Sequence, residues 1–255
     1  MLLAIDAGNT NVTCGLYDKR ALVTTFRLGS HHRSTADEWG VVIKALLRDQ
    51  GYGETPVRDA IVASVVPPLT PILQAALKHY FKVDPLIVGP GTKTGLPVRI
   101  ENPHEVGADR IVNAVAAVAK YGKPVIIVDF GTATTFDAVS AKGEYLGGAI
   151  APGIGISAEA LFTRTSKLPR VEIRKPAHVI GRSTVEAIQS GLYYGYAGLC
   201  DRLIAEMIAT YRPAKPRVIA TGGLAAAFAE ESKFIDAVDE NLTLDGLRLL
   251  WEKNR

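Results

Sequence analysis

Two related stretches of sequence decide how this chain folds: IDAGNTN at residues 5–11 and VDFGTATT at residues 128–135. In each stretch an apolar run typical of a buried strand ends in an aspartate, Asp6 or Asp129, and a turn containing glycine follows. Two further short apolar runs come after each stretch, which predicts that a three-stranded meander opens both halves of the chain. A unit that occurs twice predicts two duplicated α/β lobes.

The rest of each half alternates between helical and strand-like patterns. Apolar residues recur at helical spacing from Asp37 to Gln50, which predicts a helix packed on the first meander. We place the boundary after the helix ending near Tyr121, so the predicted lobes span residues 1–121 and 122–255. The other predicted elements are strands at 2–5, 12–17, 21–28, 59–66 and 85–88 with a helix at 69–81, then strands at 125–131, 133–140 and 144–152, a helix from 154, a strand running into a Gly turn at 217–223 and a closing helix at 242–253.

The segment NPHE, at residues 102–105, has the signals of a helix start. Asn102 is a suitable cap, Pro103 suits the first helical position, and Glu105 can bond back to the cap. We therefore predict one helix from Asn102 to Tyr121. Its apolar side packs inward, which leaves Asp109 and Asn113 on a polar face.

Composition narrows the class of protein. The chain has 255 residues, of which 47% are hydrophobic, and this is enough for a packed core. A net charge of +3 without a dense basic block argues against a nucleic-acid partner. No apolar stretch reaches the length of a membrane span, so a cytoplasmic protein is the simplest interpretation. We expect the two cysteines, Cys14 and Cys200, to be buried core thiols.

The two aspartate turns have the chemistry of a phosphate site. Gly8 allows close approach of the backbone, while the carboxylate of Asp6 would repel phosphate and is better suited to hold hydrated Mg²⁺. The alternative for this motif alone is a plain Asx-type hairpin turn. Because Asp129 and the hydroxyl of Thr132 occur at the equivalent place in the second half, we expect the two turns to face each other across a cleft.

GADR, at residues 107–110, supplies a possible base and a possible anion ligand. Asp109 could accept a proton from an attacking hydroxyl, and Arg110 could bind an anionic substrate or the transferring phosphoryl group. The alternative is an ordinary solvated ion pair.

Four other motifs are weaker. VIATGGLA, at residues 218–225, could contact adenine or ribose, or could be a plain strand-to-helix turn. GIGISA, at residues 153–158, matches a loose dinucleotide fingerprint, but no βαβ unit clearly completes it. We interpret GPGTKT, at residues 89–94, as a connecting turn. His31, His32 and Arg33 form a polar turn without a third ligand for a metal.

The order and spacing of these motifs resemble those of type III pantothenate kinases, in the superfamily of acetate kinase, sugar kinases, actin and the seventy-kilodalton heat-shock chaperones. The resemblance spans essentially the whole chain. It rests on IDAGNTN, NPHEVGADR, VDFGTATTFDAV followed by GGAIAPGIGIS, and STVEAIQSG at residues 183–191. It implies two actin-like (ribonuclease H-like) lobes, each a mixed five-stranded sheet flanked by helices, with a cleft between them. It also implies ATP-dependent phosphorylation of pantothenate to 4′-phosphopantothenate, the first step of coenzyme A biosynthesis.

The resemblance also implies roles for individual residues. The ATP-binding residues would be Asp6, Ala7, Gly8, Asn9, Thr10, Asn11, Val12, Thr13 and Thr132. The pantothenate-binding residues would be Gly107, Ala108, Asp109, Arg110 and Thr184. Asp109 would be the general base, Asp6 would hold Mg²⁺ through water, and Asp129 would hold a monovalent cation, K⁺ or NH₄⁺. The role of Thr184 comes from the resemblance alone.

The family resemblance further implies a homodimer whose substrate pocket lies near the subunit interface. The stretch from Gly191 to Leu199 is then a candidate contact. Many relatives have an aromatic residue where this chain has Ile100, so one wall of the pocket would differ. Two alternatives stay open, namely a non-catalytic regulatory or accessory protein of the same fold and a kinase of another small metabolite.

Overall fold

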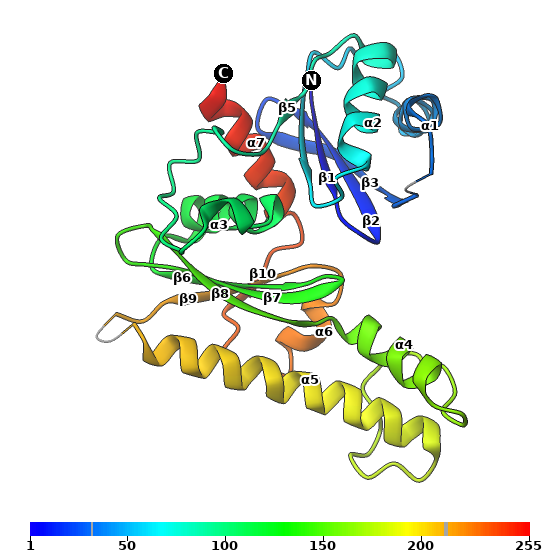
Figure 1. Cartoon of the computed structure of the whole chain (residues 1–255), viewed down its shortest axis with the longest axis vertical. Coiled ribbons are helices and arrows are strands. Elements are labelled where there is room, and N and C mark those ends of the chain that lie inside the picture. Colours follow the sequence, from blue (N-terminus) through cyan, green and yellow to red (C-terminus); the bar gives the residue numbers. More distant parts are fainter. Residues whose placement is uncertain (32, 212–213) are drawn as a thin grey trace. The chain divides into compact units, whose positions relative to one another are not determined.

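A computed structural model describes residues 1–31, 33–211 and 214–255. It contains two five-stranded sheets flanked by helices (Figure 1). The first sheet has the order β3-β2-β1-β4-β5, and the second has the order β10-β9-β6-β7-β8. The strands are β1 (Leu2–Ala7), β2 (Asn11–Asp18), β3 (Ala21–Gly29), β4 (Asp59–Ser64) and β5 (Leu86–Ile87), then β6 (Val125–Phe130), β7 (Ala133–Val139), β8 (Tyr145–Pro152), β9 (Arg217–Thr221) and β10 (Ala237–Val238).

The two sheets have the same topology. In the first, β1 pairs antiparallel with β2 and parallel with β4, and β2 pairs antiparallel with β3. In the second, β6 pairs antiparallel with β7 and parallel with β9, and β7 pairs antiparallel with β8. When the strand order of the second sheet is read from β8 to β10, it therefore matches the strand order of the first sheet. Both predicted meanders are confirmed, as is the α/β fold class of two mixed five-stranded sheets.

The chain divides into two compact units. Unit 1 contains residues 1–96, 101–116 and 241–255, and unit 2 contains residues 97–100 and 117–240. The main difference from the boundary expected at residue 121 is α7 (Leu242–Asn254), which packs on β1, β2 and β4 of unit 1. Asn254 fixes its end by exchanging hydrogen bonds with the backbone of Lys93. The lobes at 1–121 and 122–255 stay a prediction about duplication of the sequence.

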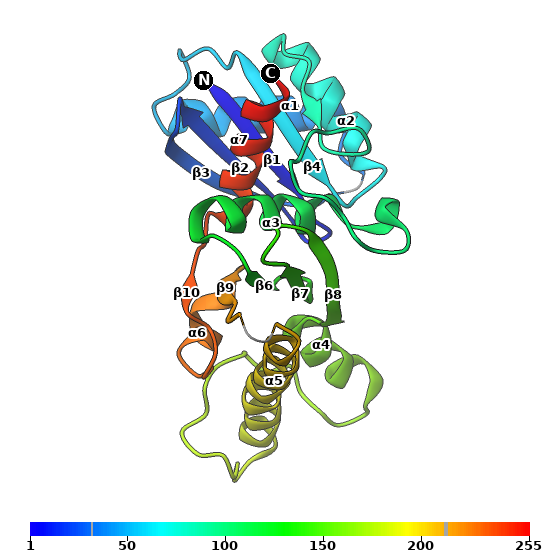
Figure 2. The same cartoon turned by 90° about the vertical axis from the view of Figure 1, so that its left-hand side faces the viewer.

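In unit 1 the sheet separates two layers of helices (Figure 2). α1 (Ala36–Asp49) and α2 (Leu69–Ala76) pack on the face to which Leu3, Ile5 and Ala7 of β1 contribute. The other face carries α7, whose Leu244 lies against Gly15 of β2. Because side chains alternate along a strand, Asp6 belongs to the α7 face.

In unit 2 the long helix α5 (Thr184–Ala209) covers one face of the sheet, together with α4 (Ile154–Arg164) and α6 (Ala225–Ala229) (Figure 1). Ile126 and Val128 of β6 and Phe136 of β7 form the core on this side. By alternation, Asp129 belongs to the opposite face.

Three local predictions need correction. The predicted helix 102–121 is a 3₁₀ turn at Pro103–Glu105 followed by α3 (Ala108–Tyr121), because the backbone is extended at Val106. The predicted helix 69–81 ends as α-helix at Ala76 and continues as a π-helical segment, Leu77–Phe81. Asn113 does not lie on an exposed polar face of the helix. It is buried, and it accepts a hydrogen bond from Thr243 of α7 at 2.7 Å.

Two other expectations concern the cysteines and the polar turn at residues 31–33. Cys14 and Cys200 are both buried, as predicted, and burial raises the pKa of Cys200 to about 12. Of the predicted turn at 31–33, His32 lies outside the described residues.

Within the described part of the chain, none of the helices combines the length and apolar character needed to cross a bilayer.

Candidate active site

Asp6 and Asp129 occupy the same position in their two sheets. Each is the fifth residue of a six-residue central strand, and each is the one half-buried residue among five buried ones. Asp6 lies opposite Thr13 in the β1–β2 register, and Asp129 lies opposite Thr135 in the β6–β7 register. The duplicated motif of the sequence is therefore a duplicated structural position, with a carboxylate and a threonine side by side.

The turn after Asp6 is held by backbone hydrogen bonds. The amide of Gly8 donates to the carbonyl of Asn11 at 2.9 Å, and a Cβ at Gly8 would lie 3.2 Å from that oxygen. Ser30, which is not part of the turn, stabilises it by two hydrogen bonds. Its amide donates to the carbonyl of Thr10 at 2.9 Å, and its hydroxyl donates to the carbonyl of Gly8. Local sequence does not identify Ser30, since nothing near it indicates that the residue after β3 contacts this turn.

The predicted ATP-binding stretch is not uniform. Asn9, Thr10 and Asn11 are exposed. Ala7 and Val12 are buried in the unit 1 core, so only their backbone groups could contact a nucleotide.

Two glycines from other segments of unit 2 lie close to Asp129 and the turn that follows it. Gly222, which follows β9, has φ +92, and a Cβ there would lie 2.6 Å from Oδ1 of Asp129. The amide of Gly153, the N-cap of α4, donates to the carbonyl of Thr132 at 3.1 Å, and a Cβ at Gly153 would collide with that carbonyl. The fingerprint glycine Gly153 thus allows two backbone segments to touch. Larger side chains at either glycine would displace the oxygens of Asp129 and Thr132.

Asp109 lies in the first turn of α3. Its Oδ1 accepts a hydrogen bond from the amide of Arg110 at 2.7 Å, and a Cβ at Gly107 would lie 2.6 Å from the same oxygen. Burial raises the pKa of Asp109, and the amide and guanidinium of Arg110 oppose that increase only in part. A carboxylate of raised pKa accepts protons more readily than an ordinary aspartate, which is the property of a general base.

Val65, directly after β4, connects the Asp109 turn to the end of β1. Its amide donates to the carbonyl of Ala7 at 3.1 Å, and its Cγ1 lies 3.5 Å from the position of a Cβ on Gly107. Unit 1 therefore brings two predicted site segments together, residues 6–8 and residues 107–110, although about 100 residues separate them in the sequence.

Thr184 is not brought to Asp129 within unit 2. It is the exposed first residue of α5, after the N-cap Ser183, and α5 covers the face of the sheet opposite to Asp129. The predicted contact stretch of the same helix is mixed, since Leu192 and Tyr193 are buried in the unit's own core.

The weaker motifs have ordinary structures. GPGTKT is a turn, as predicted, with the amide of Thr92 bonded to the carbonyl of Gly89. VIATGGLA is strand β9 followed by a glycine turn that leads into α6.

The donor atoms at the two aspartate turns suit hard cations. No group of three or more His, Cys, Asp or Glu side chains that could hold a metal occurs among the residues described. Each turn instead offers one carboxylate with hydroxyl and carbonyl oxygens. Oxygen donors fit Mg²⁺ and K⁺, and a small number of protein ligands leaves positions for phosphate oxygens and water.

Comparison with known proteins first identifies the fold. The structure resembles that of an inorganic polyphosphate/ATP-glucomannokinase from Arthrobacter sp. strain KM, with a TM-score of 0.50, 13% identity, and coverage of 99% of this chain and 97% of that one. It also resembles a protein proposed to be a Baf family transcriptional activator from Campylobacter jejuni, with a TM-score of 0.63, 20% identity and coverage of 99% and 98%. At these identities the likeness shows the fold alone, which is that of the actin-like sugar kinases.

Comparison of the amino-acid sequence identifies the family among proteins with this fold. The type III pantothenate kinase model matches residues 2–206. A protein of Geobacter sulfurreducens named type III pantothenate kinase is 57% identical over 255 residues, which is the full length of both chains. The chain belongs to the type III pantothenate kinase family.

We expect the pKa of the Asp109 carboxyl to lie above the ordinary aspartate value, because burial favours its neutral form. The folded state then binds the proton more tightly than the unfolded state. The contribution of Asp109 to stability is fully present below the unfolded-state pKa of about 3.9 and is lost as pH rises through the folded-state pKa. Asp109→Asn should therefore gain stability relative to the wild type as pH rises.

Two measurements check this expectation. Carboxyl ¹³C NMR gives the pKa of Asp109 in the native protein, and urea unfolding of both proteins at several pH values between about 3 and 8 gives the linked stability difference. An Asp109 pKa at or below the ordinary value would contradict the expectation.

Proposed function

We propose that this protein transfers the γ-phosphoryl group of ATP to the terminal hydroxyl of pantothenate and so catalyses the first step of coenzyme A biosynthesis in the cytoplasm. The observation that carries the proposal is the 57% identity, over the full length of both chains, to a protein named type III pantothenate kinase. The chemistry of the candidate site supports it, because the site combines two phosphate-type turns with a carboxylate of raised pKa.

In the proposed reaction Asp109 orients the pantothenate hydroxyl and accepts its proton as the oxygen attacks the γ-phosphorus. The bond from phosphorus to the bridging oxygen breaks, and ADP leaves. The local geometry supports this role, since Gly107 leaves room for the Asp109 carboxylate and the amide of Arg110 donates a hydrogen bond to it. Gly107, Ala108 and Arg110 are proposed to line the pantothenate pocket, and the guanidinium stabilises charge on the transferring group.

We assign the ATP phosphates to the residues from Asp6 to Thr13 and to Thr132. The exposed side chains of Asn9, Thr10 and Asn11 and the fixed backbone of the turn supply donors to phosphate oxygens. Asp6 would hold Mg²⁺ through water, and the ion would neutralise phosphate charge when bound. Asp129, beside Gly222, is the proposed ligand of a monovalent cation, K⁺ or NH₄⁺.

We further propose that the protein acts as a homodimer and that Thr184 contacts pantothenate. Support comes from the exposed apolar side chains next to Thr184, because Val179, Ile180 and Val185 are 63%, 81% and 39% exposed. These residues are better candidates for a subunit contact than the partly buried stretch from Gly191 to Leu199. Sedimentation velocity tests the dimer, and a species of one chain mass would contradict it.

Asp109→Asn should lower kcat roughly a hundredfold to ten-thousandfold, because an amide cannot accept the hydroxyl proton. Phosphorylation of pantothenate by ATP, measured by ADP release with pantothenate present and absent, checks this. Glu206→Gln, which changes an exposed carboxylate of α5 paired with Arg202, is the matched control and should retain full activity. An Asp109→Asn enzyme of normal kcat would remove Asp109 from its role as the base.

The same assay distinguishes acceptors. If the wild-type enzyme consumes ATP with another small alcohol or carboxylate and not with pantothenate, the proposed acceptor is wrong while the kinase chemistry stands. A protein that folds but phosphorylates none of these acceptors would favour the regulatory alternative.

Activity should depend on K⁺ or NH₄⁺ and decline when choline replaces them, because the bulky ion cannot fit among oxygen ligands. Asp129→Asn should raise the K⁺ concentration for half-maximal rate by at least about tenfold, since the ligand loses its charge. Rates measured over a KCl series at constant ionic strength check this. A rate indifferent to K⁺ in both proteins would contradict the assignment.

A further inference from the structure

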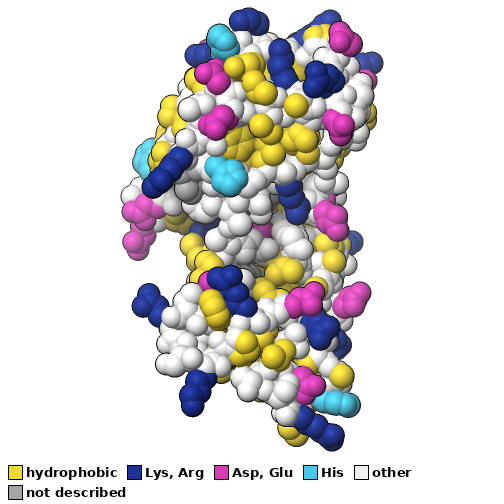
Figure 3. All heavy atoms as spheres, turned by 90° about the vertical axis from the view of Figure 1, so that its right-hand side faces the viewer, with side chains coloured by type: hydrophobic (Ala, Val, Ile, Leu, Met, Phe, Trp, Pro, Cys, Tyr) yellow, Lys and Arg dark blue, Asp and Glu magenta, His cyan; other side chains and the backbone are white. Residues whose placement is uncertain are grey.

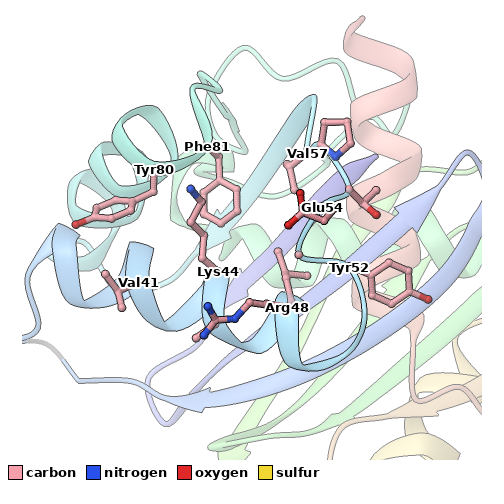
Figure 4. A pocket seen from close by; sticks show the side chains of 13 residues that line it. Val41, Lys44, Arg48, Tyr52, Glu54, Val57, Tyr80 and Phe81 are labelled. Atoms are coloured by element: carbon pink, nitrogen blue, oxygen red, sulfur yellow. The ribbon is translucent and has the colours of Figure 1, made fainter.

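A separate cavity lies in unit 1 on the α1 and α2 side of the sheet, the side opposite to Asp6. Its volume is about 600 Å³, and its walls come from α1, the loop at residues 52–57 and the end of the π-helical segment (Figure 4). None of the residues assigned to ATP, pantothenate or cations lines it. The volume lies within the range of roughly 300–1,000 Å³ that is usual for small-molecule sites.

The π-helical segment builds the aromatic wall of this cavity. Leu77–Phe81 widens the end of the α2 helix and stops at Lys82, which is left-handed with φ 60. The ring of Tyr80 packs on Gly40 of α1, where a Cβ would collide with it, and its hydroxyl donates to Asp37 at 3.0 Å. Single π-helical turns within helices occur frequently at functional sites. The wall is thus fixed by specific contacts with α1.

Two cations of α1 line the cavity (Figure 4). Lys44 and Arg48 are four residues apart and so lie one above the other on the helix. The ammonium of Lys44 is 5.8 Å from the centre of the Phe81 ring. Among the residues that the structure describes, neither cation has a carboxylate within ion-pair distance, whereas Lys78 of the π segment lies 3.1 Å from Asp84.

The lining therefore has an excess of one positive charge beside an apolar surface. Glu54 is its single acidic residue. Val41, which is 54% exposed, and Phe81 provide apolar contacts, and apolar side chains reach the surface on this side of unit 1 (Figure 3). A ligand that matches both properties has a negative head and an apolar body.

We propose that this cavity binds an amphipathic organic anion, a carboxylate, sulfonate or phosphate monoester attached to a ring or branched apolar group. The head group lies between Lys44 and Arg48, where charge-assisted hydrogen bonds are available. The apolar body packs against Phe81 and Val41. The site is independent of the phosphotransfer site, because it lies on the opposite face of the unit 1 sheet from Asp6.

The probe for this site is 8-anilinonaphthalene-1-sulfonate, a fluorescent aromatic sulfonate, titrated into the full-length protein with MgATP in excess. We expect one saturable site per chain. The double variant Lys44→Gln/Arg48→Gln should weaken binding at least about tenfold, because both charged contacts to the sulfonate are lost. Lys78→Gln is the matched control, since Lys78 is on the π segment but outside the lining, and it should leave the affinity unchanged.

Glu54→Gln should tighten binding several-fold, because it removes the negative charge facing the anion. This gain in affinity keeps the test decisive even if the double variant fails to fold, which circular dichroism would reveal. Wild-type affinity in a folded double variant, an unchanged affinity in Glu54→Gln, or the absence of saturable binding while MgATP is in excess would each overturn the proposal.

Discussion

The structure depends on one electrostatic constraint: a carboxylate must be held near the end of a buried central strand, in each of two sheets, without being fully desolvated. Asp6 and Asp129 meet this constraint in the same way, as the one half-buried residue of an otherwise buried strand. A fully buried, unpaired carboxylate would be costly, and a fully exposed one would not be fixed in position. The strand fixes the carboxylate in position, and its place next to the turn leaves it half-buried rather than fully desolvated.

Glycine is a second requirement in both units, because at three positions a side chain would collide with a carboxylate or carbonyl oxygen. Gly107 makes room for Oδ1 of Asp109, and Gly222 makes room for Oδ1 of Asp129. Gly153 does the same for the carbonyl of Thr132. Gly107 lies in unit 1, and Gly153 and Gly222 lie in unit 2, so each unit depends on glycines at positions where a side chain would collide with an oxygen atom.

Local patterns predicted the repeated meanders, the main helices and the two aspartate turns, because alternation and turn chemistry act over a few residues. They could not predict features that depend on distant segments. Nothing near Asn113 indicates that Thr243 will bury it, and nothing near α7 indicates that it packs on unit 1. The predicted helix start at Asn102 is wrong because the cap signals there stabilise a short 3₁₀ turn, and α3 begins at Ala108. Thr184 could be identified only through family resemblance.

The central proposal is that the turns after Asp6 and Asp129 both bind the phosphates of ATP. A crystal structure with Mg²⁺ and a non-hydrolysable ATP analogue tests it most directly. We expect the phosphate chain to accept hydrogen bonds from the turn at residues 8–11 and also from the turn at residues 131–132. A nucleotide whose phosphates contact one of these turns and leave the other in solvent would contradict the claim.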